Sequence, residues 1–90
     1  MIEKLNVYKK AYDVSLVIHK LTLDFPKLEQ IGGIADQLRR SSKSIVANLV
    51  EGYALKNIYP AKFKSYLVNS IASNDETKLW LNYAKDLSYI

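Results

Sequence analysis

One stretch of the sequence places five polar side chains where they could act together. They are Gln37, Arg40, Ser44, Asn48 and Glu51. In an α-helix, which advances about 100° per residue, these positions fall within an arc of about 80° and form a continuous line, here called the polar seam. Arginine, serine, asparagine and glutamate can in principle polarise a substrate, so the seam has first to be tested as a catalytic site.

The surroundings of the seam argue against catalysis. No base lies within one helical turn of Ser44, and no glycine loop that could form an oxyanion hole accompanies it. Gly32-Gly33 is not a P-loop, because the Gly-Lys-Ser/Thr ending is missing and no strand precedes it. The chain has no cysteine and one histidine, which excludes zinc–thiolate and histidine-cluster sites. We therefore predict no catalytic residue, no metal and no cofactor.

Two other interpretations of the seam stay open: a solvated helix surface, or a hydrogen-bonded network buried between helices or subunits. The network is favoured because short hydrogen-bonding residues stand where lysine and glutamate would be the ordinary solubilising residues. Arg40 and Glu51 lie about 16 Å apart along the helix axis and cannot pair with each other. Each therefore needs another partner if it is covered, and Glu76 is the candidate acceptor for Arg40.

Three long helices are expected to position these residues within one domain spanning residues 1–90. Breaks at 25–33, with a proline and paired glycines, and at 57–60, with Pro60, divide the chain. The predicted helices cover about residues 4–23, 33–56 and 60–87. No alternating pattern predicts a strand, so the fold class is all-α.

The apolar positions predict how the helices pack. The first helix has two apolar stripes, Leu5-Tyr8-Tyr12-Leu16-Leu23 and Val7-Ala11-Val14-Ile18-Leu21, as expected for contact with two neighbours. The core face of the second carries Ile34, Leu38, Ser42, Ile45, Val46, Leu49 and Tyr53, and we expect Asp36, Arg39 and Lys43 to face solvent. The third has small polar residues at Ser70, Ser73 and Thr77, which favour close, antiparallel up-down packing.

The net charge and the targeting signals limit which kinds of partner the protein is expected to have. The formal net charge is +4, from 13 Lys and Arg against 9 Asp and Glu, which permits a nucleic-acid partner without requiring one. The N-terminus has no signal-peptide apolar core, and no apolar run approaches the roughly 20 residues of a membrane span. A cytoplasmic protein with no membrane partner is therefore expected.

Several motifs resemble a known family. They are Leu5-x-Val7-Tyr8-Lys9-Lys10-Ala11-Tyr12, Phe25-Pro26, the run from Gln37 to Gly52, and Ser73-x-x-Glu76. This pattern is similar to the four-helix-bundle proteins encoded in 23S rRNA intervening sequences, over essentially the whole chain. The run from 37 to 52 is its most specific part, and it includes four seam residues that match the family motif, as does Glu76.

The resemblance implies an up-down four-helix bundle that assembles into a ring, typically a pentamer, with no established enzymatic activity. It also implies kinship with the accessory protein of diversity-generating retroelements, a basic ring that contacts a reverse transcriptase and nucleic acid. Family members usually continue into a fourth helix, whereas this sequence ends at Ile90. We therefore expect three helices here, with the fourth missing or supplied by another chain, and a homo-oligomer.

Two hypotheses of function follow. In the first, the protein is a non-catalytic adaptor whose oligomer concentrates basic residues for contact with RNA or DNA. The candidate residues are Lys9, Lys10, Arg39, Lys43 and Lys56. In the second, it is a structural or protein-interaction bundle with no nucleic-acid role, and its charge serves ordinary solubility.

Overall fold

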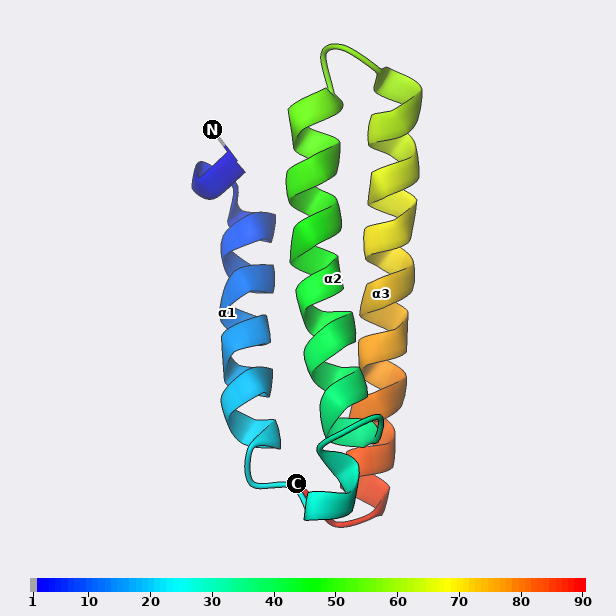
Figure 1. Cartoon of the computed structure of the whole chain (residues 1–90). Coiled ribbons are helices and arrows are strands. Elements are labelled where there is room, and N and C mark those ends of the chain that lie inside the picture. The colour runs from blue at the N-terminus through cyan, green and yellow to red at the C-terminus, as the bar shows by residue number, and fades with distance from the viewer. Residues whose placement is uncertain (1) are drawn as a thin grey trace.

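The computed structural model describes residues 2–90, and these form helices and no strand (Figure 1). The three long helices are α1 (Asn6–Thr22), α2 (Ile34–Leu55) and α3 (Pro60–Asp86). Two short 3-10 helices, η1 (Ile2–Lys4) and η2 (Lys27–Glu29), precede α1 and α2. The all-helical class with three long helices is thus confirmed for the described residues.

The connection between α1 and α2 is shaped by glycines and by a buried carboxylate. Gly32 has a φ of 75°, a conformation that side chains other than glycine rarely adopt. A Cβ on Gly33 would come within 2.6 Å of the Cα of Glu29, so the chain can pass here only without a side chain. Glu29 Oε1 accepts a hydrogen bond from the Ile34 amide at 3.0 Å, which satisfies a free donor at the start of α2.

The C-terminal segment closes over this connection. Tyr89 donates a hydrogen bond to Glu29 Oε2 at 2.8 Å, and its ring lies 5.3 Å from that of Phe25 between centroids. The hydrogen bond to Glu29 raises the pKa of the Tyr89 phenol, since ionising the phenol would remove the proton that it donates. Tyr89 and residues of the α1–α2 connection, which are distant in the sequence, therefore hold together the end of the molecule that carries this connection.

Helix α2 lies between α1 and α3 and packs against both (Figure 1). Its contact with α3 is made through small side chains. Ser41 Oγ lies 2.8 Å from Thr77 Oγ1, and Ser70 Oγ donates to the Ile45 carbonyl at 3.0 Å. Short polar side chains that bond to each other let the two backbones approach closely.

Gly52 extends this close contact and supports a prediction. A Cβ there would lie 2.9 Å from Tyr66 Cβ. Gly52→Ala should therefore lower the free energy of unfolding by about 1–2 kcal/mol, although alanine is the better helix former. Urea unfolding followed by circular dichroism measures this. The exposed Ala47→Gly variant reports helix propensity alone, and a stabilised Gly52→Ala protein would contradict the close approach.

The buried core is small and lies toward the end of the molecule that carries the α1–α2 connection. It consists of Ile18, Phe25, Ala35, Leu38 and Ala84. The buried residues of α1 are Ser15, Ile18 and Thr22, of which Ile18 belongs to the second apolar stripe expected from the sequence and the other two belong to neither stripe. Much of both stripes is exposed, including Tyr12 of the first and Val14 of the second.

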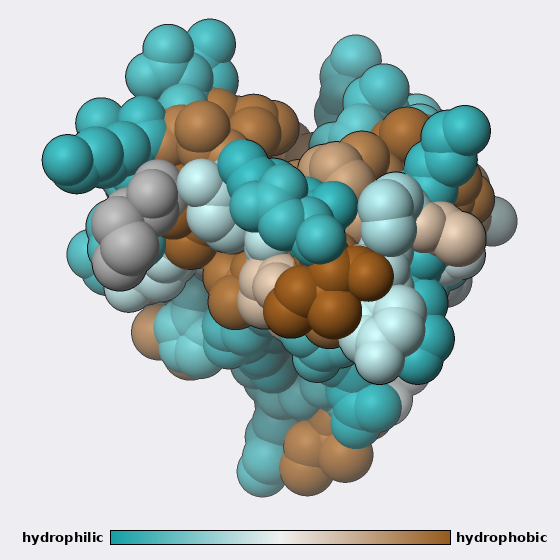
Figure 2. Space-filling model, turned by 90° about the horizontal axis from the view of Figure 1, so that it is seen from above, coloured by the Kyte–Doolittle hydropathy of each residue, from teal (hydrophilic) through white to brown (hydrophobic). Residues whose placement is uncertain are grey.

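An open apolar groove runs between α1 and α3, with α2 at its floor. Its volume is about 530 Å³, and its apolar lining includes Val7, Val14, Ile45, Leu49, Leu67 and Ile71. A smaller cavity of about 150 Å³ shares Val7, Leu49 and Leu67 with it and continues toward η1. Seen from above, several apolar side chains remain at the surface among polar ones (Figure 2). Within residues 2–90, no helix has the length and apolar character needed to cross a membrane.

Candidate polar network and nucleic-acid interface

The middle of the polar seam lies against α3. Ser44 Oγ is 2.9 Å from Ser73 Oγ, and Asn48 Nδ2 donates to the carbonyl and hydroxyl oxygens of Ser44 at 2.8 and 3.1 Å. Ser44, Asn48 and Gln37 are all half-buried. Two of the five seam residues therefore belong to one hydrogen-bonded group at the edge of the α2–α3 contact.

The two charged residues of the seam lie farther out. Arg40 Nε donates to Asp36 Oδ1 at 3.1 Å, one helical turn away, and the Arg40 side chain is 75% exposed. Glu76, the acceptor expected for Arg40, instead accepts from Trp80 Nε1 at 3.2 Å. Glu51 is exposed, and its hydrogen bond with Tyr66 raises the pKa of that phenol. Arg40 is thus paired within its own helix, whereas the partner of Glu51 comes from α3, and neither charge belongs to a buried ion pair.

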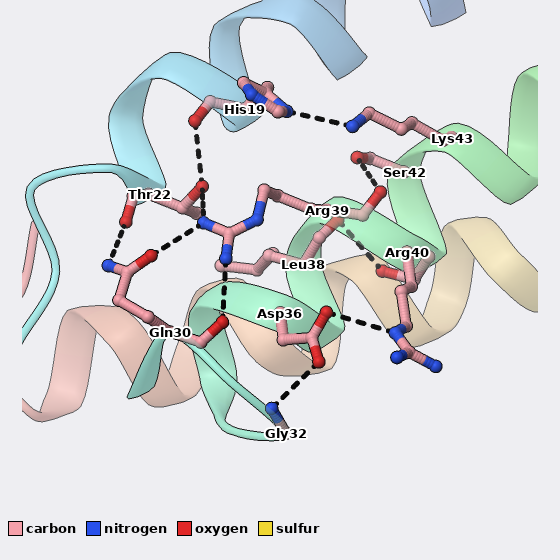
Figure 3. A network of polar contacts seen from close by, with 11 residues as sticks. His19, Thr22, Gln30, Gly32, Asp36, Leu38, Arg39, Arg40, Ser42 and Lys43 are labelled. Atoms are coloured by element: carbon pink, nitrogen blue, oxygen red, sulfur yellow. Dashed lines mark hydrogen bonds and ion pairs between the residues drawn. The ribbon is translucent and has the colours of Figure 1, made fainter. Parts of the chain in front are cut away.

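Arg39, the residue before Arg40 in the sequence, makes extensive hydrogen bonds through its guanidinium group (Figure 3). Its Nη1 donates to Thr22 Oγ1 at 3.0 Å and to Gln30 Oε1 at 3.1 Å, and its Nη2 donates to the Gln30 carbonyl at 2.9 Å. Gln30 Nε2 in turn donates to the carbonyls of Thr22 and Phe25. We call Thr22, Gln30 and Arg39 the Arg39 network. It joins the end of α1, the connection and α2.

The expectation that Asp36, Arg39 and Lys43 face solvent was wrong in two of three cases. Arg39 is half-buried in its network, and Asp36 is half-buried beside Gly32 and Arg40. The Gly32 amide and then Arg40 hold the pKa of the Asp36 carboxyl below its usual value. Thr22 is fully buried and follows Ser15 and Ile18 at helical spacing. This polar residue in line with a buried face is the feature of the sequence that could have indicated a polar partner, such as Arg39, opposite α1.

Lys43 is exposed, but it also has a specific neighbour. Its Nζ lies 2.9 Å from Nδ1 of His19 on α1, where a lysine ammonium can only donate and the imidazole nitrogen must accept (Figure 3). His19 is half-buried, at the boundary between the α1–α2 contact and solvent. The pair therefore requires an imidazole that is unprotonated at Nδ1.

The five cations proposed for nucleic-acid contact each have different surroundings. Lys9 is exposed on α1, Lys10 lines the apolar groove, and Lys56 Nζ lies 4.4 Å from the centroid of the Tyr53 ring. Lys43 contacts His19, whereas the guanidinium of Arg39 is engaged inside its network. Among residues 2–90, no hydrogen bond or ring contact joins two of these five.

Few of the cations are neutralised by ion pairs. Between described residues there are two, Arg40–Asp36 at 3.1 Å and Lys78–Asp75 at 3.9 Å. Each pair joins residues three or four positions apart within a single helix, α2 for the first pair and α3 for the second. In the same part of the chain, no group of three or more His, Asp and Glu side chains gathers where it could hold a metal ion.

Comparison with known proteins identifies a family for this chain. The family model described as 23S rRNA-intervening sequence protein matches residues 3–90. Searches of curated proteins and of solved structures found no significant match.

Proposed function

Because the chain belongs to the 23S rRNA-intervening sequence protein family, we propose that it is a non-catalytic subunit of a homo-oligomer that contacts RNA or DNA. The three helices form part of an antiparallel, up-down four-helix bundle, which a helix from a neighbouring copy completes. The assembled protein acts in the cytoplasm as an adaptor, through its surface and not through a catalytic site.

The apolar groove is the main support for the proposed assembly of several copies. It leaves apolar residues of all three helices open to solvent above a small core. Soluble monomers rarely expose contiguous apolar surface of this kind, and covering it is a strong drive to associate. A groove on one copy that receives a different surface of the next makes a heterologous contact, and such contacts form a ring when the rotation between copies closes. By resemblance to the family, we expect five copies in that ring.

The charge distribution supports nucleic acid as the partner. The net charge is +4, and most of the 13 Lys and Arg residues have no ion-pair partner among the described residues. A phosphate contact made by one exposed lysine is weak, but a ring repeats it in every subunit. Binding should therefore be multivalent, electrostatic and strongly dependent on salt.

A salt series tests this proposal. Fluorescence anisotropy of a labelled single-stranded RNA should show binding at low salt that weakens steadily as salt rises, with a slope of about −0.7 per phosphate contacted. A negligible signal at low salt would contradict nucleic-acid binding. That result would favour the alternative, a structural or protein-interaction bundle whose charge serves solubility.

A further inference from the structure

Cationic side chains gather where α1 meets α2 without a carboxylate among them. Lys43 Nζ faces His19 Nδ1 at 2.9 Å, and Arg39, four residues before Lys43 on α2, donates to Thr22 at the end of α1. The acceptors of Arg39 are the hydroxyl of Thr22 and two oxygens of Gln30, all uncharged. The positive charge of this cluster is thus not balanced by any group to which it is hydrogen-bonded.

Asp36, an acidic side chain in the first turn of α2, is already occupied. Asp36 accepts from Arg40 Nε at 3.1 Å through one oxygen and from the Gly32 amide at 2.8 Å through the other. The imidazole of His19 contacts Lys43 of α2, and the His19 carbonyl accepts from the Thr22 hydroxyl, which in turn accepts from Arg39. Between described residues, no hydrogen bond or ion pair gives His19 or Lys43 an anionic partner.

We propose that Lys43 and His19 form a binding site for one phosphate group of a nucleic-acid backbone, and that the site is complete when His19 is protonated. This inference rests on the proposed contact with nucleic acid and assigns it a position. Lys43 is exposed and His19 is half-exposed, so both are accessible to a backbone lying along the α1–α2 face.

Protonation changes the chemistry of the pair. With a neutral imidazole, Nδ1 accepts from the Lys43 ammonium and the two groups satisfy each other. After protonation Nδ1 carries a hydrogen and can no longer accept, so two cationic donors face the same space. A phosphate oxygen that accepts from both restores the lost bond and offsets their repulsion. Histidine is the side chain whose charge ordinarily changes between pH 5 and 8.

Arg39 is the positioning residue of this site. It holds Thr22 Oγ1, and the Thr22 hydroxyl in turn donates to the His19 carbonyl at 2.9 Å. The last turn of α1, which carries the imidazole, is thereby fixed against the turn of α2 that carries Lys43. Fixing both turns before binding lowers the entropic cost of holding the phosphate.

The test compares RNA affinity at pH 6.0 and pH 8.0, at constant ionic strength, in the full chain and three variants. Wild-type protein should bind labelled RNA about two- to fivefold more tightly at pH 6.0. His19→Gln keeps an acceptor for Lys43 but cannot be protonated, so it should remove this pH dependence. Lys43→Gln should weaken binding at both pH values and reduce the salt slope by about 0.7.

Lys64→Gln is the matched control, because it removes one exposed lysine on α3, away from the proposed site. An equal loss in Lys64→Gln and Lys43→Gln, or RNA binding that is identical at the two pH values, would overturn this site while leaving nucleic-acid binding intact. No RNA binding at either pH would overturn both proposals. His19 is the single histidine, so its imidazole proton NMR signals report directly, and they should move when RNA is added at pH 6.0.

Discussion

Replacing Arg39 by alanine should lower the free energy of unfolding by about 2–3 kcal/mol, because hydrogen bonds from a charged donor are lost and their buried acceptors are left unpaired. Thr22 is fully buried, and Gln30 would keep only its bonds to main-chain carbonyls. The same substitution at Arg40 should cost less than about 1 kcal/mol, since it removes an ion pair at a largely exposed side chain. Urea unfolding followed by circular dichroism measures both values.

The two variants control for each other, because they remove the same side chain from adjacent positions of one helix. Equal losses at Arg39 and Arg40 would contradict the Arg39 network. Arg39→Lys adds a second check. It preserves the charge but not the two-nitrogen geometry that reaches Thr22 and Gln30, so it should recover less than half of the loss.

Introducing a charge into the groove should break the proposed assembly. Ile71 is 62% exposed in the single chain and lines the groove, so Ile71→Glu should leave the helices folded. In the oligomer the same carboxylate would be buried against a neighbouring copy without a partner, at a cost of several kcal/mol. Light scattering coupled to size-exclusion chromatography should therefore show a change from oligomer to monomer at micromolar concentration.

Val68→Glu is the control for this experiment. Val68 is 61% exposed on the same helix but does not line the groove, so this variant should remain an oligomer. A monomeric wild-type protein would contradict the assembly itself, and a monomeric Val68→Glu variant would show that the interface lies elsewhere on α3. A ring with a stoichiometry other than five would contradict the expected size alone.

The sequence by itself determined the helices and the small polar side chains through which α3 contacts α2. Pro26, the glycine pair before α2 and Pro60 mark the breaks, because each restricts or frees the backbone locally. The small polar residues of α3 are recognisable from their spacing, and the structure places Ser70 and Thr77 against α2. These features depend on local propensity and on periodicity along one helix, both of which the sequence carries directly.

Only the tertiary structure decided which charged residues are engaged. Arg39 and Arg40 are neighbours in one helix, and helical periodicity gives their directions without saying what lies in each direction. The partners of Arg39 come from the end of α1 and from the connection, 17 and 9 residues away in the chain. The turn at Gly32 and Gly33 is what brings these partners within hydrogen-bonding distance of Arg39. For the same reason, the excess of apolar residues was visible in the sequence, but which of them form an open groove depends on how α1 and α3 pack on α2.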